Sequence, residues 1–356
     1  MKRVIVFVLA YLGVIGLLSI PLFSIAEEGK WTIKSDIPTP RGVLSASVVN
    51  GKIYAIGGQI AVNGVPKVIS TVEEYDPVTD KWTKKADMPT ARAWFSTSAV
   101  NGKIYAIGGA ITFDNRPFWF SSIPTVEEYD PANDKWIKKA NMPIIQNSGP
   151  WGLTTSVVNE KIYVIGGWDG KFISMVLEYN PATDTWVRKK DMPTPRAYLS
   201  SAVVNGKIYA IGGQIIQSNG GPVTSIVEEY NPVTDTWTRK ADMLTARMYL
   251  SVTELNGRIY ATGGAINESE VIATIEEYDP ITDRWVKKGD MLNKRGVHSA
   301  VTVNGKIYIF GGGAEENTPP YTTMEEYDPG TVITTNVESK GKLTGTWAQL
   351  KKVKIY

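Results

Sequence analysis

The chain contains no cysteine among its 356 residues. Disulfide bonds, thiol nucleophiles, thiolate metal sites and lipid attachment through an N-terminal cysteine are therefore excluded. A chain of this length can bury a large apolar core without covalent cross-links, so we expect a fold that is stabilised by packing alone.

Histidine is almost as scarce, because His298 is the only one. A Ser-His-Asp triad would have to use it, and we find no Gly-x-Ser-x-Gly segment that would present a serine nucleophile. The chain also has no glycine-rich phosphate loop and no EF-hand spacing. We therefore predict no catalytic residue, no cofactor and no metal site. His298 itself is expected to be a packed core residue, since the equivalent positions of the repeats described below carry Leu or Phe.

An excess of one charge is missing as well. The whole chain has 38 Lys and Arg against 36 Asp and Glu, and residues 27–356 carry 36 of each. Proteins that bind nucleic acid usually show a basic excess or a basic stripe. We therefore predict no nucleic-acid partner.

The N-terminus holds a long apolar run. Lys2 and Arg3 precede VIVFVLAYLGVIGLLSI, and the small residues Ser24 and Ala26 occupy the −3 and −1 positions of a cleavage site. This pattern predicts a signal peptide over residues 1–26 that is cleaved near Ala26, and hence a secreted, periplasmic or cell-surface location. After cleavage we expect no membrane span. An uncleaved membrane anchor is the alternative, because the run approaches the length of a span.

One ten-residue segment occurs six times. VNGKIYAIGG at 49–58 recurs unchanged at 100–109 and 204–213, and looser copies occupy 158–167, 255–264 and 303–312. Successive copies are 46 to 58 residues apart, a period typical of propellers. Asn-Gly between two β-branched runs predicts a hairpin, and a second strand pair flanks an Asp-Pro turn in segments such as TVEEYDPVTDKWTKK. Each repeat thus predicts four short antiparallel strands, which make one blade.

The repeats resemble the kelch motif. A Gly-Gly doublet, a Glu-Tyr-Asp-Pro segment, a Trp seven residues after that Tyr and a preceding Pro-x-x-Arg recur, with variations, from residue 31 to about 330. The resemblance implies an all-β, six-bladed kelch β-propeller over residues 27–330, with repeats starting near 41, 92, 150, 196, 247 and 295. We expect each Gly pair to be needed for close packing or an unusual backbone angle, and each Trp to fill the space above the glycines.

The sixth repeat lacks its Trp, because the residue seven positions after Tyr327 is Thr334. The segment KWTIKSDIPTPR at 30–41 matches KWTKKADMPTAR at 81–92 at eight of twelve positions. We therefore expect the strand around Trp31 to complete the sixth blade and close the ring, which removes an exposed sheet edge. Trp347 is a rival for that place. Residues 331–356 are otherwise a C-terminal tail of unknown role.

Five repeats carry an arginine nine residues before the Asn of the hairpin. These are Arg41, Arg92, Arg196, Arg247 and Arg295, whereas the third repeat has Pro150. With the innermost strands lining a central channel, these arginines would ring one of its mouths. In one mammalian kelch-like protein such arginines capture an acidic peptide, so the resemblance implies an anion-accepting site. The structural alternative is that each arginine binds backbone carbonyls or a neighbouring blade's Glu, since repeated residues usually serve the repeat.

Aromatic residues gather at the same predicted mouth. Trp94, Tyr198 and Tyr249 stand two residues after an arginine, and Trp151 follows Pro150. The loops after the Gly pairs add Trp119 and Trp168. Exposed rings suit peptide anchoring or sugar stacking, and the alternative for each is packing of its own loop. The third repeat departs most from the others, so we expect the ligand-contacting arc around the second and third blades.

The predicted function is a secreted, non-catalytic module that recognises a protein, peptide or glycan through these arginines and aromatic residues. Two alternatives stay open. Some exported kelch propellers are mutarotases of sialic acid, so the resemblance also implies an enzyme of this kind, whose general base would be a loop acid. The candidate bases are Glu268, Glu270, Glu315 and Glu316. A structural envelope or matrix protein is the other alternative.

Overall fold

A computed structural model describes residues 29–62, 65–112, 120–143, 149–215, 222–314 and 320–330. The chain divides into two units, one spanning Gly29–Asp328 and the other made of Met1–Glu28 with Pro329–Tyr356. In the second unit only Pro329 and Gly330 are described. The predicted signal peptide and C-terminal tail therefore lie outside the described residues. Within the described ranges, no helix has the length and apolar character needed to cross a membrane.

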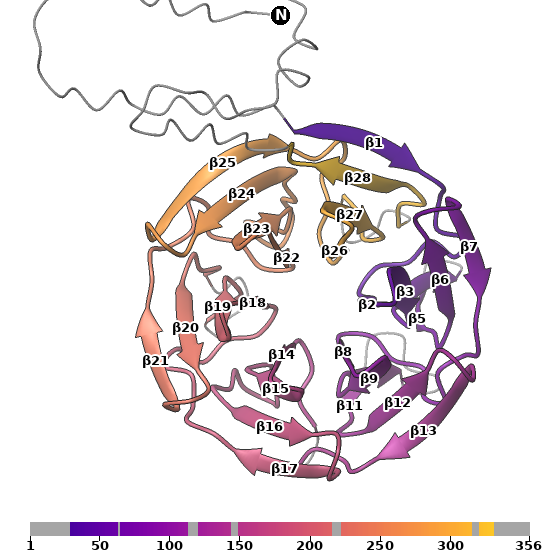
Figure 1. Cartoon of the computed structure of the whole chain (residues 1–356), viewed down its shortest axis with the longest axis horizontal. Helices are drawn as coiled ribbons and strands as arrows, with labels where there is room; N and C mark the ends of the chain where they lie inside the picture. Colours follow the sequence, from indigo (N-terminus) through magenta and orange to yellow (C-terminus); the bar gives the residue numbers. More distant parts are fainter. Residues whose placement is uncertain are drawn as a thin grey trace, which may run out of the picture. The chain divides into compact units, whose positions relative to one another are not determined.

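The unit Gly29–Asp328 is a ring of blades, and its described residues form six four-stranded antiparallel sheets (Figure 1). From the innermost strand outward, the first three blades are β2 (Ser45–Val49), β3 (Lys52–Ile56), β6 (Val72–Asp76) and β7 (Lys81–Lys84); β8 (Ser96–Val100), β9 (Lys103–Ile107), β12 (Val126–Asp130) and β13 (Lys135–Lys139); and β14 (Thr154–Val158), β15 (Lys161–Ile165), β16 (Val176–Asn180) and β17 (Thr185–Arg188). The last three are β18 (Ser200–Val204), β19 (Lys207–Ile211), β20 (Val227–Asn231) and β21 (Thr236–Arg239); β22 (Ser251–Leu255), β23 (Arg258–Thr262), β24 (Thr274–Asp279) and β25 (Arg284–Asp290); and β26 (Ser299–Val303), β27 (Lys306–Phe310), β28 (Met324–Asp328) and β1 (Lys30–Lys34). The predicted six-bladed propeller is confirmed.

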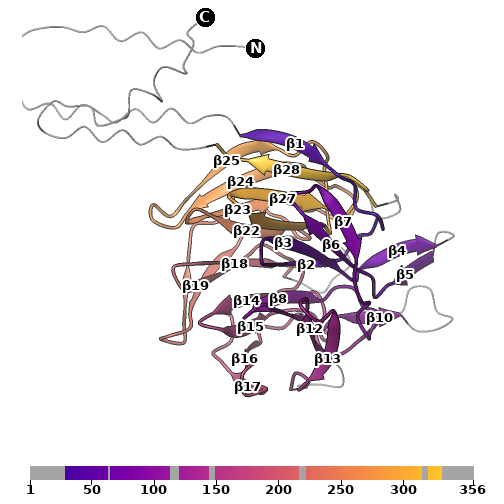
Figure 2. The same ribbon diagram turned by 45° about the vertical axis from the view of Figure 1, so that its right-hand side comes forward.

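Two additional hairpins extend loops between the second and third strands of a blade. One is β4 (Gln59–Val62) with β5 (Val65–Val68) in the first blade, and the other is β10 (Ala110–Thr112) with β11 (Phe120–Ser122) in the second. Figure 2 shows β4, β5 and β10 on one side of the ring. The residue after each Gly pair forms a bridge with the residue that enters the innermost strand, as in Gly42 with Gln59 and Trp151 with Trp168. The entry loops and these hairpin loops therefore share one face, as predicted.

The ring is closed by the N-terminal strand. β1 pairs antiparallel with β28, with Trp31 opposite Tyr327 and their ring centroids 4.8 Å apart. The prediction that the Trp31 segment completes the sixth blade is confirmed. The rival residue Trp347 lies outside the described residues.

The apolar core lies between the blades. Each of six buried clusters combines two neighbouring blades, and one of them joins Ile53 and Tyr75 of the first blade to Phe310 of the sixth. The repeated Trp belongs to these junctions: Trp82 packs on Tyr75, and its Nε1 donates to the Ser35 carbonyl at 3.0 Å. The expectation that each Trp covers the glycines is wrong, because no Trp side chain is among the nearest atoms that a Cβ on any of the Gly pairs would meet.

The Gly pairs fill a different role in the same junctions. Gly57 and Gly58 have φ values of 56° and 104°. A Cβ on Gly57 would lie 2.8 Å from the Arg92 carbonyl oxygen, and one on Gly58 would lie 2.7 Å from the Gly42 carbonyl oxygen. Real Cβ atoms do not approach backbone so closely, so the pair allows adjacent chain segments to meet.

Candidate functional site

The five arginines predicted at the channel mouth are completely buried, with 0% exposure each. Each pairs with a Glu on the third strand of its own blade, not of a neighbouring one. The pairs are Arg41–Glu73 at 2.6 Å, Arg196–Glu228 at 2.8 Å, Arg247–Glu276 at 2.6 Å, Arg295–Glu325 at 2.8 Å, and Arg92–Glu127. The guanidinium groups also donate to backbone, as Arg92 does to the Gly108 carbonyl at 3.1 Å and the Thr125 carbonyl at 2.9 Å.

Their burial contradicts the prediction that these arginines face a ligand. Burial lowers the pKa of Arg196 to about 10, although Glu228 opposes the shift, so the guanidinium is charged at neutral pH. The sequence contained a sign of this pairing. The third repeat has Pro150 in place of the arginine and also has Leu177 where the other repeats have the Glu. Loss of both partners together indicates that they serve each other.

The mouth is framed instead by the residue two positions after each arginine, and by the residue two positions after Pro150 in the third blade. These six residues are Val43, Trp94, Gly152, Tyr198, Tyr249 and Val297, and their φ values lie between 51° and 64°. The N–H of Gly152 donates to the Trp94 carbonyl at 2.9 Å, and Tyr198, Tyr249, Val297 and Val43 continue this chain of bonds from blade to blade at 2.8 to 3.1 Å. Residues with bulky side chains rarely adopt the left-handed backbone conformation. The hydrogen bonds between the blades therefore hold this backbone in place.

Four partly exposed aromatic residues at this mouth form a group that we call the aromatic cluster: Trp94, Trp151, Tyr198 and Tyr249. The ring of Trp94 lies 5.8 Å from that of Trp151, 5.4 Å from that of Tyr198 and 5.3 Å from that of Tyr249. Trp94 and Tyr249 belong to the second and fifth blades, which are opposite in a six-bladed ring. Their contact therefore crosses the channel mouth, and the prediction that these residues gather there is confirmed.

The cluster continues onto the third blade. Trp168 contacts Trp151 at 5.5 Å between ring centroids, and Phe172 contacts Tyr198 at 6.5 Å. Phe172 was not predicted, although it lies in the same irregular loop as Trp168, four residues further along. Trp119, the remaining predicted aromatic residue, lies outside the described residues.

Inside the mouth is a cavity of about 150 Å³. Its walls include one hydroxyl residue from each blade, at the fourth position after the arginine or, in the third blade, after Pro150: Ser45, Ser96, Thr154, Ser200, Ser251 and Ser299. Several of these hydroxyls link adjacent blades, for example Ser96 with Thr155 and Thr154 with Ser201, each at 2.8 Å. The hydroxyls therefore serve mainly the joining of the innermost strands.

His298 lines the same cavity but is buried, with 6% exposure. Its Nε2 is 2.9 Å from Thr262 Oγ1, and that hydroxyl donates to the Ser251 carbonyl, so Nε2 carries the proton. Burial, with smaller effects of Arg295 and Arg247, lowers the pKa of His298 to about 3. The prediction of a packed core histidine is confirmed. No group of three His, Asp or Glu side chains placed to hold a metal ion occurs among the described residues.

Comparison with known families agrees with this architecture. The profile "Kelch motif" matches residues 41–89, 91–143 and 295–351, and the profile "KLHDC2/KLHL20/DRC7 Kelch-repeats domain" matches residues 149–312. The chain belongs to the kelch-repeat β-propeller family. Among its relatives, Kelch-like protein 25 of Rattus norvegicus is 33% identical over 250 residues, which cover 68% of this chain and 40% of that protein. Kelch-like protein 23 of Homo sapiens is 30% identical over 241 residues, covering 66% of this chain and 39% of that protein.

This kelch propeller thus spans about 40% of the length of these curated relatives. A solved structure titled "Structure of YjhT" superimposes with a TM-score of 0.68 and 18% sequence identity. The match covers 82% of this chain and 96% of that one. At this level of identity the likeness concerns the fold alone.

The acids considered for a mutarotase do not form a site in the part of the propeller that is described. Glu268 and Glu270 are exposed in the loop after β23, whereas Glu315 and Glu316 lie outside the described residues. The arginines that would have bound the acidic sugar form ion pairs with glutamates inside the blades, as Arg196 and Arg247 do. A mutarotase site therefore has no support from the described residues of this mouth.

Proposed function

We propose that this kelch propeller is an exported, non-catalytic binding module whose aromatic cluster holds a segment of a partner protein. Kelch propellers are generally protein-interaction modules. The observation that carries the proposal is the position of Trp94, which contacts rings from three other blades across the channel mouth and is still partly exposed. Partly exposed aromatic residues at the centre of a concave face are typical anchors of protein interfaces.

The arrangement of the rings favours a protein segment over a glycan. Neighbouring rings in the cluster are inclined to one another by 48° to 64°, so ring edges lie against ring faces. Such packing leaves little flat ring face for a sugar to stack on, whereas apolar side chains can insert between inclined rings. Because the arginines are buried, they give no support to the anionic character that the sequence had suggested for the ligand.

The proposal is tested with the purified protein on a random-peptide array and on a glycan array. We expect peptide binding that Trp94→Ala and Tyr249→Ala each weaken by about tenfold or more, as for truncation of an interface anchor. Alanine tolerates the left-handed backbone of these positions no worse than the aromatic residues do, so the substitutions test the rings. Trp237→Ala, on an outermost strand, is the control that removes a Trp far from the mouth.

Two results would contradict the proposal. Glycan binding that the same two variants abolish would show that the cluster holds a sugar. Unchanged peptide binding by both variants would show that the aromatic cluster is not the binding site. Export is tested separately, by the mass of the mature protein, which should begin at Glu27.

A further inference from the structure

A second pocket, of about 300 Å³, lies in the third blade beside the aromatic cluster. Its apolar walls are Pro143, Pro150, Pro195, Phe172, Ile173 and Met175. Phe172 also contacts Tyr198 of the aromatic cluster, so the two features adjoin. We refer to this feature as the Phe172 pocket.

The Phe172 pocket occurs in the one blade that lacks the buried ion pair. Pro150 and Met175 occupy the positions of Arg92 and Thr125 in the second blade, where the guanidinium binds the Thr125 carbonyl. The third blade has no guanidinium at this place, and the matching Glu is replaced by buried Leu177. Where the other blades have a buried ion pair, the loops of the third blade therefore present apolar side chains.

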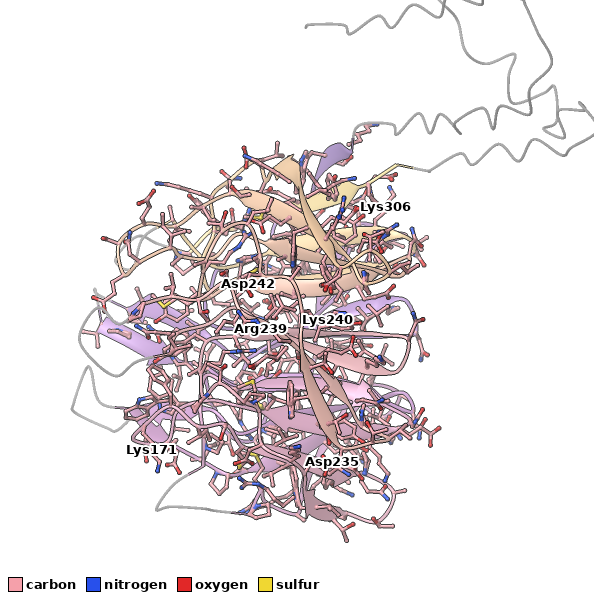
Figure 3. The ribbon with its side chains drawn as sticks, turned by 90° about the vertical axis from the view of Figure 1, so that its left-hand side faces the viewer. Lys171, Asp235, Arg239, Lys240, Asp242 and Lys306 are labelled. Carbon is pink, nitrogen blue, oxygen red and sulfur yellow. The ribbon has the colours of Figure 1, made fainter. Side chains whose placement is uncertain are left out.

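The rim of the pocket carries the cation of Lys171. Lys171 is exposed and forms no ion pair within the described part of the chain. Arg188 and Asp169 line the pocket as well, and Arg188 forms an ion pair with Asp191 at 2.5 Å. Lys306 is the first residue of β27, the second strand of the sixth blade, and marks the face away from the mouth. In the side view of Figure 3, Lys171 lies on the opposite face. The pocket is thus apolar inside and positive at one edge.

We propose that the Phe172 pocket holds one large apolar side chain of the partner segment, and that a carboxylate next to this side chain pairs with Lys171. This inference rests on the proposed function, because it names a second contact of the same ligand. A volume of about 300 Å³ is at the small end of ligand pockets and suits one large side chain such as Leu or Phe. An acidic neighbour on the ligand matches by charge the exposed Lys171, which forms no ion pair among the described residues.

The probe is a set of immobilised peptides with a common Gly-Ser frame and two variable central residues. The pairs are Leu-Glu, Leu-Gln, Leu-Lys and Ala-Glu. Wild-type protein should bind Leu-Glu best, with a loss of about tenfold for Ala-Glu, which lacks the apolar anchor, and about fivefold for Leu-Lys, which reverses the charge. Equal binding of the four peptides, or none, overturns the inference.

Two variants then locate the contact. Ser174→Trp fills the pocket from its edge, and Ser225→Trp makes the same change at the equivalent position of the fourth blade. We expect Leu-Glu binding to fall about tenfold with Ser174→Trp and to persist with Ser225→Trp. Lys171→Glu should reverse the preference, so that Leu-Lys is bound more tightly than Leu-Glu. Thermal unfolding of each variant establishes that it is folded.

The outcomes separate this inference from the proposed function. If Ser174→Trp and Lys171→Glu bind every peptide as the wild type does, while Trp94→Ala is defective, the Phe172 pocket is not the contact and the aromatic cluster stands. If Trp94→Ala also binds normally, both are wrong.

Discussion

Single residues in this propeller divide into those that hold a blade together and those that face the mouth. The five arginines hold blades, because each is buried beside a Glu and bound to backbone carbonyls. A buried pair of this kind adds little net stability, but loss of one partner leaves an uncompensated buried charge. Substitution of these arginines should therefore lower the free energy of unfolding and leave ligand binding unchanged.

Arg196→Ala should lower the free energy of unfolding by about 3–5 kcal/mol, because Glu228 stays buried without its cation. The double variant Arg196→Leu with Glu228→Leu should recover most of this loss, since the third blade already carries apolar residues at both positions. Urea unfolding measures both effects. If Arg196→Ala unfolds like the wild type but no longer binds peptides, the arginine contacts the ligand and the structural assignment is wrong.

His298 should make stability depend on pH. Its pKa is about 3 in the folded protein and about 6.5 in the unfolded chain, so the unfolded state binds the proton first. The contribution is complete above pH 6.5 and declines by up to about 1.4 kcal/mol per pH unit as the pH falls toward 3. Between pH 6.5 and 4.5 the wild type should lose about 2 kcal/mol more than His298→Leu. Parallel pH profiles of unfolding for the two proteins would refute this assignment.

At the scale of elements, the repeated hairpin has two kinds of glycine. Gly206 follows Asn205 in a tight turn, with φ at 73°, and a Cβ on it would meet no atom within 4 Å. Gly212 follows β19 directly, with φ at 65°, and there a Cβ would lie 2.6 Å from the Arg247 carbonyl oxygen. The φ values of Gly206 and Gly212 are similar, and the two positions differ only in how closely a neighbouring segment packs against them.

Gly206→Ala should therefore cost about 1 kcal/mol, which is the ordinary penalty of a left-handed non-glycine residue. Gly212→Ala should cost about 3 kcal/mol or more, because the contact with the neighbouring blade must also open. Denaturant unfolding of the two variants under the same conditions gives the comparison. Equal losses would mean that conformation alone, and not inter-blade contact, requires the second glycine.

For the whole propeller, the decisive element is the closing strand. In the first blade Asp80 accepts hydrogen bonds from Tyr75 at 2.6 Å and from the Ser35 N–H of the sixth blade at 2.9 Å, and four other junctions repeat this contact. The sixth blade has Gly29 where the Asp would stand, and the Tyr327 hydroxyl is buried without a partner among the described residues. Closure there depends on β1 and on the packing of Trp31.

Trp31→Ala should lower the free energy of unfolding by about 2–4 kcal/mol, because its ring packs on Tyr327 in the closing blade. Trp347→Ala should change it by less than about 0.5 kcal/mol, because β1 already fills the closing position beside β28. Equilibrium unfolding in urea compares the two. The opposite ranking would mean that the C-terminal segment closes the ring.

The fold could be predicted almost completely because its signals are local and repeated. Asn-Gly specifies the hairpin wherever it occurs, and the match of residues 30–41 to 81–92 identified the missing strand of the sixth blade. The site was predicted only in part. The positions of Trp94 and Tyr249 after their arginines placed both at one mouth, but Phe172 and Lys171 became relevant only through the folded shape of the irregular loop in the third blade.

The amino-acid sequence alone established the number of blades, the strands within each and the segment that closes the ring, since these follow from periodicity and neighbouring residues. It left open the direction in which a side chain points from the start of an innermost strand. Arg196 turns into its own blade, where it forms an ion pair with Glu228, whereas Tyr198, two residues later, turns toward the mouth. The contact of Trp94 with Tyr249 likewise exists only after six blades close into a ring, because it joins residues on opposite sides of the channel.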